Sequence, residues 1–165
     1  MNIIYFNPDQ LRADFVGCYG NEMVKTPNID RLAREGVRYD QCHVQHPVCT
    51  PSRCSFMTGW YPHVRGHRTL WYPLQPEEPN TMKYLKQNGY ETHMIGKNDL
   101  FRSNAFEDSV TKVYPTVWGK EGSRDIFKKD EPGYQSFLYG PSDAPNVDWY
   151  RTEKAVEFLK SRKSG

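Results

Sequence analysis

Residues that start and end helices recur along about the first hundred positions of the chain. Thr26 and Pro27, followed by Gly36, illustrate the pattern, because threonine caps a helix, proline suits its first turn and glycine ends it. Residues of the same kinds predict helices at 27–35, 51–58 and 81–88. Apolar or alternating runs, which are typical of strands, occupy 2–6, 37–44 and 90–95. Strands that alternate with helices predict an α/β fold with a mainly parallel sheet flanked by helices.

The 165-residue chain has the length of one domain, residues 1–165. Between about 104 and 146 the regular pattern stops, and glycines, prolines and aromatic residues follow one another without a period. We expect an irregular excursion there, because the stretch is longer than an ordinary connection. Beyond it, an apolar stripe that includes Ala155, Val156 and Leu159 predicts a final helix.

Charge and hydropathy restrict the classes of partner. The formal net charge is only +2, so we expect no nucleic-acid partner. No apolar run is long enough to span a membrane, and residues 1–10 lack the basic and long apolar regions of a signal peptide. As written, the protein is expected in the cytoplasm without a membrane partner. A chain whose leader had been removed would carry the same sequence.

One of the four cysteines has a setting that suggests chemistry. Four cysteines in a chain this long do not form a disulfide scaffold, and their spacing matches none of the usual zinc patterns. Cys49, however, stands just ahead of a helix that opens at Pro51, and Arg53 follows within one turn. The first turn of a helix favours negative charge. Cys49 is therefore a candidate nucleophile, and the alternative is an ordinary buried thiol.

A second candidate site follows the first predicted strand. Asp9 and Gln10 come directly after residues 2–6, where an α/β fold places its ligands. A carboxylate and an amide oxygen suit a hard cation such as Ca²⁺ or Mg²⁺. Asn-Pro-Asp is also ordinary turn chemistry, so the residues alone leave both interpretations open.

Three stretches in order resemble motifs of the sulfatase family, the formylglycine-dependent members of the alkaline phosphatase superfamily. "CTPSRCSFMTG" (49–59) resembles the family signature, "PDQLRAD" (8–14) its metal-binding loop, and "GYETHMIGK" (89–97) a later block. The resemblance covers roughly the first hundred residues, and the last helix resembles family sequence more loosely. It implies an alkaline phosphatase-like fold that is incomplete in this chain.

The resemblance also implies a chemistry. In the family, the residue matching Cys49 is oxidised to formylglycine by a formylglycine-generating enzyme, and the hydrated aldehyde attacks the sulfur of a sulfate ester. Arg53 matches the partner of this nucleophile, and Lys97 matches the lysine that contacts the sulfuryl oxygens. The implied substrate is a small-molecule or sugar sulfate ester.

The implied metal ligands are Asp9, Gln10 and Cys49, and the implied cation is Ca²⁺, with Mg²⁺ or Mn²⁺ as alternatives. Gln10 stands where many members have a second aspartate. Asp99 is a further departure, because the family commonly has histidine two residues after the matching lysine. As a candidate substrate-binding residue, Asp99 would repel sulfate unless it offsets a cationic group or pairs with Lys97.

The stretch "YPHVRGHRTLWYP" (61–73) resembles the border of the family's substrate pocket. His67 is the candidate general acid for the leaving oxygen, and Arg65 is a candidate anion contact. Both residues have a simpler interpretation. His67 would be a loop histidine that only makes structural hydrogen bonds, and Arg65 would be a solvated arginine.

Family members run to several hundred residues, so the resemblance implies an N-terminal portion with part of its cation ligands elsewhere. We therefore expect little activity from this chain alone, together with self-association or pairing with a C-terminal part. Two alternatives stay open: a phosphonate or phosphate ester hydrolase of the same superfamily, and a non-catalytic sulfatase-like fragment.

Overall fold

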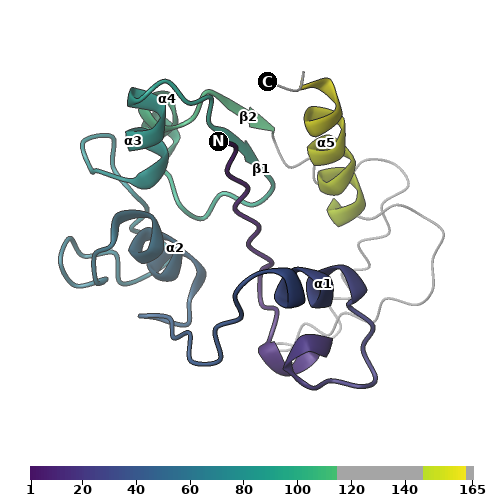
Figure 1. The fold of residues 1–165 in the computed structure, drawn as a ribbon. Helices are drawn as coiled ribbons and strands as arrows, with labels where there is room; N and C mark the ends of the chain where they lie inside the picture. Colours follow the sequence, from purple (N-terminus) through teal and green to yellow (C-terminus); the bar gives the residue numbers. More distant parts are fainter. Residues whose placement is uncertain (115–146, 163–165) are drawn as a thin grey trace, which may run out of the picture.

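The computed structural model describes residues 1–114 and 147–162. Its helices and strands are, in chain order, α1 (Pro27–Glu35), α2 (Cys49–Thr58), α3 (Thr81–Gln87), β1 (His93–Ile95), α4 (Phe106–Ser109), β2 (Lys112–Tyr114) and α5 (Val147–Ser161) (Figure 1). Short 3-10 helices are η1 (Ala13–Phe15), η2 (Gly17–Tyr19) and η3 (Ser103–Ala105). Within the described residues, no helix is long and apolar enough to cross a membrane.

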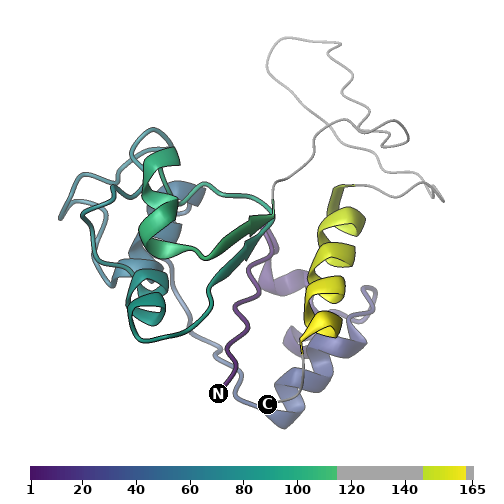
Figure 2. The ribbon, with the colours of Figure 1, turned by 90° about the horizontal axis from the view of Figure 1, so that it is seen from above.

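A parallel sheet lies between two groups of helices. β1 and β2 pair in parallel, with Met94 opposite Val113, and a further parallel bridge joins Leu74 to Phe101. α3 and α4 lie on one side of the sheet and α5 on the other (Figure 2). On the α5 side, the rings of His93 and Phe158 lie with their centroids 4.1 Å apart. The predicted parallel sheet flanked by helices is therefore present, on a small scale.

Two helix ends follow the residues that the sequence supplies for them, whereas Thr26 precedes α1 without a capping side-chain hydrogen bond. α3 begins after Asn80, whose side chain accepts a hydrogen bond from the backbone N–H of Lys83 at 2.9 Å, as an N-cap does. α2 ends before Gly59, which has a left-handed φ of 75° that glycine adopts without strain. One expectation is corrected: α2 begins at Cys49, two residues ahead of the expected start at Pro51.

The core joins α2 to the segment that follows β1. Its buried members are Cys54, Leu74, Leu100, Phe101, Ala105 and Val110. Phe106 packs against this cluster, its ring centroid 5.5 Å from that of Phe101. Because Cys54 belongs to α2 and Leu100 follows β1, the core fixes the position of the helix relative to the sheet.

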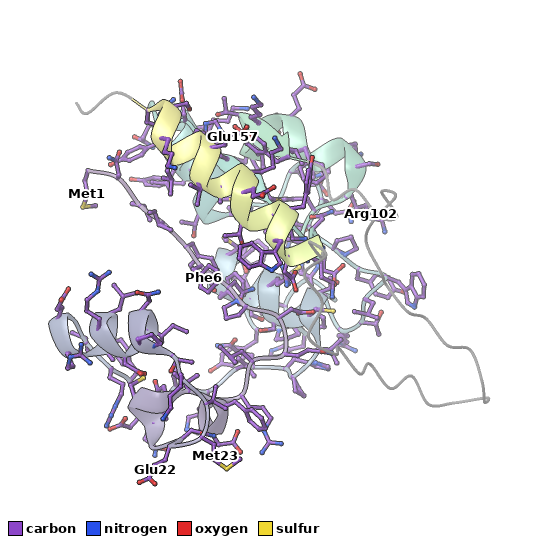
Figure 3. The ribbon with its side chains drawn as sticks, turned by 90° about the vertical axis from the view of Figure 1, so that its right-hand side faces the viewer. Met1, Phe6, Glu22, Met23, Arg102 and Glu157 are labelled. Carbon is purple, nitrogen blue, oxygen red and sulfur yellow. The ribbon has the colours of Figure 1, made fainter. Side chains whose placement is uncertain are left out.

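Two predicted strands are absent from the structure. Residues 2–6 and 37–44 form no strand, and their apolar side chains are exposed, with Ile4 73% and Phe6 78% accessible. Figure 3 labels Met1 and Phe6 on the first of these segments, which runs between the sheet and α5 in the view of Figure 2. A strand needs a neighbouring strand for its backbone N–H and C=O groups, and among residues 1–114 and 147–162 no backbone–backbone hydrogen bond to these segments is formed.

The irregular excursion expected at 104–146 begins later in the chain than the sequence suggested. Regular structure continues through α4 and β2 to Tyr114, because the apolar residues of this stretch join the core and the sheet. Residues 115–146 lie outside the described residues. The predicted final helix is confirmed as α5.

Candidate functional site

The N-terminus of α2 presents Cys49. Val48 precedes the helix with extended backbone, and Cys49 is its first residue. Thr50 and Pro51 are buried, whereas Cys49 is half-buried. The first backbone N–H groups of a helix lack partners within it and favour negative charge nearby. Cys49 thus lies at an end of the helix suited to an anionic substrate.

Asp9 brings three segments of the chain together. Its Oδ1 lies 3.3 Å from Nη2 of Arg53, and its Oδ2 lies 3.0 Å from Nζ of Lys97. Arg53 belongs to α2, and Lys97 follows β1. Nη1 of Arg53 also donates a hydrogen bond to the carbonyl oxygen of Lys97 at 3.1 Å. The structure therefore brings these three candidate residues into contact.

Asp99 completes the cluster from the same turn as Lys97. Its Oδ2 lies 2.8 Å from Nζ of Lys97, and its charge acts on the nearby thiol of Cys49. Of the roles open to Asp99, pairing with Lys97 is the one the geometry shows. We call Asp9, Cys49, Arg53, Lys97 and Asp99 the carboxylate–cation cluster.

The cluster shifts the protonation of its members. Burial raises the pKa of the Cys49 thiol, and the hydrogen bond and charge of Asp99 raise it further. Burial alone would lower the pKa of Lys97, but hydrogen bonds to Asp99 and Asp9 raise it overall. Burial opposes the shift at Asp99 too, yet the hydrogen bond from Lys97 leaves the pKa of its carboxyl lowered. Because only a thiolate is strongly nucleophilic, these directions disfavour direct attack by an unmodified Cys49.

Asp9 and Gln10 are the candidate cation ligands that the sequence predicts. Asp9 offers a carboxylate of the kind that Ca²⁺ binds, but both of its oxygens accept from Arg53 and Lys97. Gln10 is exposed and has a left-handed φ of 62°. No group of three or more His, Cys, Asp or Glu side chains able to hold a metal occurs within residues 1–114 and 147–162. The donor types fit a hard cation, but these residues do not complete its shell.

Two predicted residues lie elsewhere and make other contacts. His67 is buried, its Nδ1 lies 2.6 Å from the carbonyl oxygen of Tyr72, and its Nε2 lies 3.1 Å from Oε1 of Glu78. With both ring nitrogens engaged in its own loop, His67 has the geometry of a structural histidine. The guanidinium of Arg65 lies over the ring of Trp60, 5.7 Å from its centroid. Neither has a described contact with the carboxylate–cation cluster.

Sequence reasoning did not single out Glu78 or Asn98. Glu78 is the buried partner of His67, and its Oε2 also accepts from the backbone N–H of Gln75 at 2.8 Å. Asn98 lies between Lys97 and Asp99, and its side chain bonds the backbone of its own turn. An asparagine after a strand is a known turn signal, so Asn98 could have been found from the sequence. A glutamate buried by tertiary contacts carries no such signal.

Comparisons with known proteins identify the family of the chain. The family model described as Sulfatase matches residues 1–163. N-acetylglucosamine-6-O-sulfatase of Bacteroides thetaiotaomicron is 36% identical over 98% of this chain, and the chain spans 28% of its length. A solved structure described as a complex with its substrate D-glucosamine-2-N,6-O-disulfate is 35% identical, with a TM-score of 0.52 over 55% of this chain and 18% of that one.

A further crystal structure, described as a sulfatase from Bacteroides thetaiotaomicron, has a TM-score of 0.68 over 94% of this chain and 31% of that chain. At 22% identity it bears on the fold alone. The predicted alkaline phosphatase-like fold class is confirmed by these structures, of which this chain represents a part. The chain belongs to the sulfatase family.

Proposed function

We propose that the carboxylate–cation cluster is the nucleophile end of an active site that hydrolyses a sulfate ester. The observation that carries this proposal is the meeting of Asp9, Arg53 and Lys97, which come from three separate segments. Cys49 begins the helix that contains Arg53, and the charge of Lys97 acts on its thiol. The cluster combines a nucleophile position at a helix N-terminus with two cationic side chains. That combination suits attack on an anionic ester.

Lys97 and Arg53 have different tasks in this proposal. The ammonium of Lys97 has three N–H donors, of which Asp9 and Asp99 engage two. The remaining donor is available for a sulfuryl oxygen. Arg53 is 9% accessible and bonds Asp9 and the Lys97 carbonyl, so its charge is held near Cys49 by fixed contacts. Both cations would stabilise negative charge that develops on the transferring group.

Cys49 takes its role after a formylglycine-generating enzyme, with molecular oxygen as the oxidant, converts its –CH2–SH group to an aldehyde and removes the sulfur. In the hydrated aldehyde, one hydroxyl oxygen forms a bond to sulfur while the bond from sulfur to the ester oxygen breaks and the alcohol leaves. The second hydroxyl then loses its proton, the aldehyde forms again, and the carbon–oxygen bond to sulfate breaks. Water hydrates the aldehyde for the next cycle. The raised pKa of the unmodified Cys49 thiol supports this route over thiolate attack.

A divalent cation, most simply Ca²⁺, would neutralise sulfate oxygens next to Asp9. Asp9 and Gln10 are the described residues with suitable oxygens, together with residue 49 once it carries oxygen in place of sulfur. Further ligands must come from outside the described residues.

The substrate class that we propose is a sulfated sugar. Two relatives support it: one is named N-acetylglucosamine-6-O-sulfatase, and one solved structure holds D-glucosamine-2-N,6-O-disulfate. Since the chain spans 28% of the length of that relative, we propose that activity requires further polypeptide that completes the pocket and the cation site.

The decisive experiment is peptide mass analysis of the segment that carries Cys49, from a host that contains a formylglycine-generating enzyme. We expect an aldehyde at residue 49 that a hydrazine reagent traps, and a Cys49→Ser variant as the untrapped control. A thiol that stays wholly unmodified, beside a control sulfatase converted in the same cells, would contradict the proposal and favour a non-catalytic chain.

Parallel assays on an aryl sulfate and an aryl phosphonate ester then test the reaction class. They use a protein that contains this chain together with the further polypeptide that completes the pocket. We expect faster sulfate turnover, lost in Lys97→Ala. Faster phosphonate turnover would instead assign the site to the alternative reaction of the superfamily.

A further inference from the structure

We propose that Asn98 is a positioning residue, whose carboxamide holds Lys97 and Asp99 in the orientation that the carboxylate–cation cluster requires. The importance of this role rests on the proposed function of the cluster. The carboxamide makes three hydrogen bonds to its own turn. Nδ2 donates to the carbonyl oxygen of Phe101 at 2.6 Å, and Oδ1 accepts from the N–H groups of Leu100 at 3.2 Å and Phe101 at 2.9 Å.

The turn that Asn98 closes contains a strained residue. Asp99 has a φ of 36°, in a region that residues other than glycine adopt at a cost, although aspartate tolerates it better than most. Such a conformation persists only where surrounding contacts hold it. The hydrogen bonds from the Asn98 side chain to the backbone of Leu100 and Phe101 bridge Asp99, because they join the residue before it to the two residues after it. Without them, Asp99 would relax toward negative φ and carry its carboxylate away from Lys97.

Both ends of the turn are anchored separately, which leaves its middle to Asn98. At the far end, Leu100 and Phe101 lie in the core. Leu100 accepts a hydrogen bond at its carbonyl oxygen from the N–H of Leu74 at 2.8 Å. At the near end, the carbonyl oxygen of Lys97 accepts from Arg53 at 3.1 Å. The backbone conformation between these two anchors therefore decides whether the side chains of Lys97 and Asp99 lie together.

The contacts of Asn98 also define what it does not do. Its three side-chain hydrogen bonds go to backbone atoms within three residues of it. Its carboxamide is thus occupied by the turn and makes no described contact with Cys49 or Asp9. Asn98 acts through its two neighbours, so a test must report the position of Lys97 rather than stability alone.

A zero-length carbodiimide crosslink provides that readout. The carbodiimide adds to a carboxylate and activates it. A nearby amine then attacks the activated carbonyl carbon and forms an amide, and the carbodiimide leaves as a urea that contains the lost oxygen. Nζ of Lys97 lies 3.0 Å from Oδ2 of Asp9, far away in the sequence. Nζ of Lys83 lies 3.0 Å from Oδ2 of Asp108 in another part of the protein. Peptide mass analysis measures both crosslinks in one sample.

The protein also offers a matched control residue. Asn21 makes the same three kinds of bond: its Nδ2 donates to the carbonyl oxygen of Asp14 at 2.6 Å, and its Oδ1 accepts from Met23 N at 2.9 Å and Val24 N at 2.8 Å. These bonds lie beside η2 and α1, where Glu22 and Met23 are labelled in Figure 3. Asn21→Ala therefore removes an equivalent set of bonds without touching the cluster.

We expect Asn98→Ala to lower the yield of the Lys97–Asp9 crosslink about fivefold relative to Lys83–Asp108, the effect of roughly one net hydrogen bond. Asn98→Asp keeps the acceptor for Leu100 and Phe101 and should restore most of that yield. Asn21→Ala should leave the ratio unchanged.

A wild-type ratio in Asn98→Ala, or an equal fall in Asn21→Ala, would overturn the role of Asn98. If Asn98→Ala lowers both crosslinks, the measurement is repeated with an osmolyte that restores the Lys83–Asp108 crosslink, and the ratio then decides. The crosslink needs neither formylglycine nor turnover. A protein that proves inactive on sulfate esters would contradict the proposed function and still report on Asn98.

Discussion

Residues 49–110 and residues 1–48 differ in how far their apolar side chains are buried. The first region buries Leu74, Leu100, Phe101 and Val110 around α2 and the turn after β1. In the second, Val16 is the apolar residue that reaches full burial. Its exposed large apolar side chains include Ile3, Ile4, Phe6, Val37, Tyr39 and Val44. Within the described residues, the first region packs apolar side chains into one buried cluster, although Tyr61 and Trp71 remain exposed, and the second region forms no such cluster.

This difference shows what holds the candidate site. Cys49, Arg53, Lys97 and Asp99 belong to the packed region, so their relative positions follow from a core that this chain forms by itself. Asp9 belongs to the other region and is held to them through its two ion pairs. The exposed segments have the composition of strands without a neighbour, which is the type of surface that binds further polypeptide.

The largest expected effect is on the packed region. Leu74 is 0% accessible and Ile4 is 73% accessible. Leu74→Ala should lower the free energy of unfolding by about 3 kcal/mol, because it leaves a cavity in the core. Ile4→Ala should change it by less than about 0.5 kcal/mol. Urea unfolding followed by circular dichroism measures both, and equal costs would remove the contrast between the regions.

The next effect concerns association through residues 2–6. We expect this chain to self-associate, and Ile4→Lys to weaken the association about tenfold, or about 1.4 kcal/mol, because a charge on an unpaired strand opposes pairing. Sedimentation velocity over a range of concentrations measures it. Met23→Lys is the control, since Met23 is also exposed but lies beside α1. A monomeric wild-type chain, or an equal effect of Met23→Lys, would show that this segment is no interface.

A smaller effect is expected at the cap of α3. Asn80 is buried, caps the helix through Lys83 N and donates from Nδ2 to Oγ of Ser109 at 3.0 Å. Asn80→Ala should cost about 1 kcal/mol in the free energy of unfolding. Asn88→Ala, which removes an exposed bond to the Tyr84 carbonyl, should cost less. Thermal and urea unfolding compare them, and a larger loss from Asn88→Ala would contradict the assignment of Asn80 as the stabilising cap.

The smallest effect is on thiol reactivity within the cluster. Burial first, and then Asp99, raises the pKa of the Cys49 thiol, so its thiolate forms only at higher pH than usual. Asp99→Asn removes the negative neighbour, lowers that pKa and should raise the iodoacetamide rate at Cys49 about threefold at fixed pH. Asparagine tolerates the positive φ at this position.

Peptide mass analysis separates the cysteines in this experiment. Exposed Cys42 should react at an unchanged rate in the variant. Cys54, whose pKa burial raises to about 12, should react last in both proteins. A slower Cys49 in Asp99→Asn would show that its neighbour acts on it in some other way.

Much of the fold could be predicted from local sequence. The start of α1 at Pro27, the cap of α3 at Asn80 and the end of α2 at Gly59 depend on residues within a few positions, and the structure confirms them. The strands expected at 2–6 and 37–44 could not be predicted from local sequence. A strand forms only where another strand supplies hydrogen-bond partners for its backbone N–H and C=O groups. The predicted excursion began too early for a related reason: Val110 is buried by contacts distant in sequence.

For the site, the sequence by itself determined which residue types are available and where they stand along the chain. The motif around Cys49 and the resemblance at Asp9 and Lys97 were sufficient to expect them in one site. Only the tertiary structure decided that Asp99 pairs with Lys97 and that His67 is bound to Glu78 within its own loop. The physical reason is range: caps and turns are set by neighbours in the chain, whereas the partner of a charged side chain is set by which segments the core brings together.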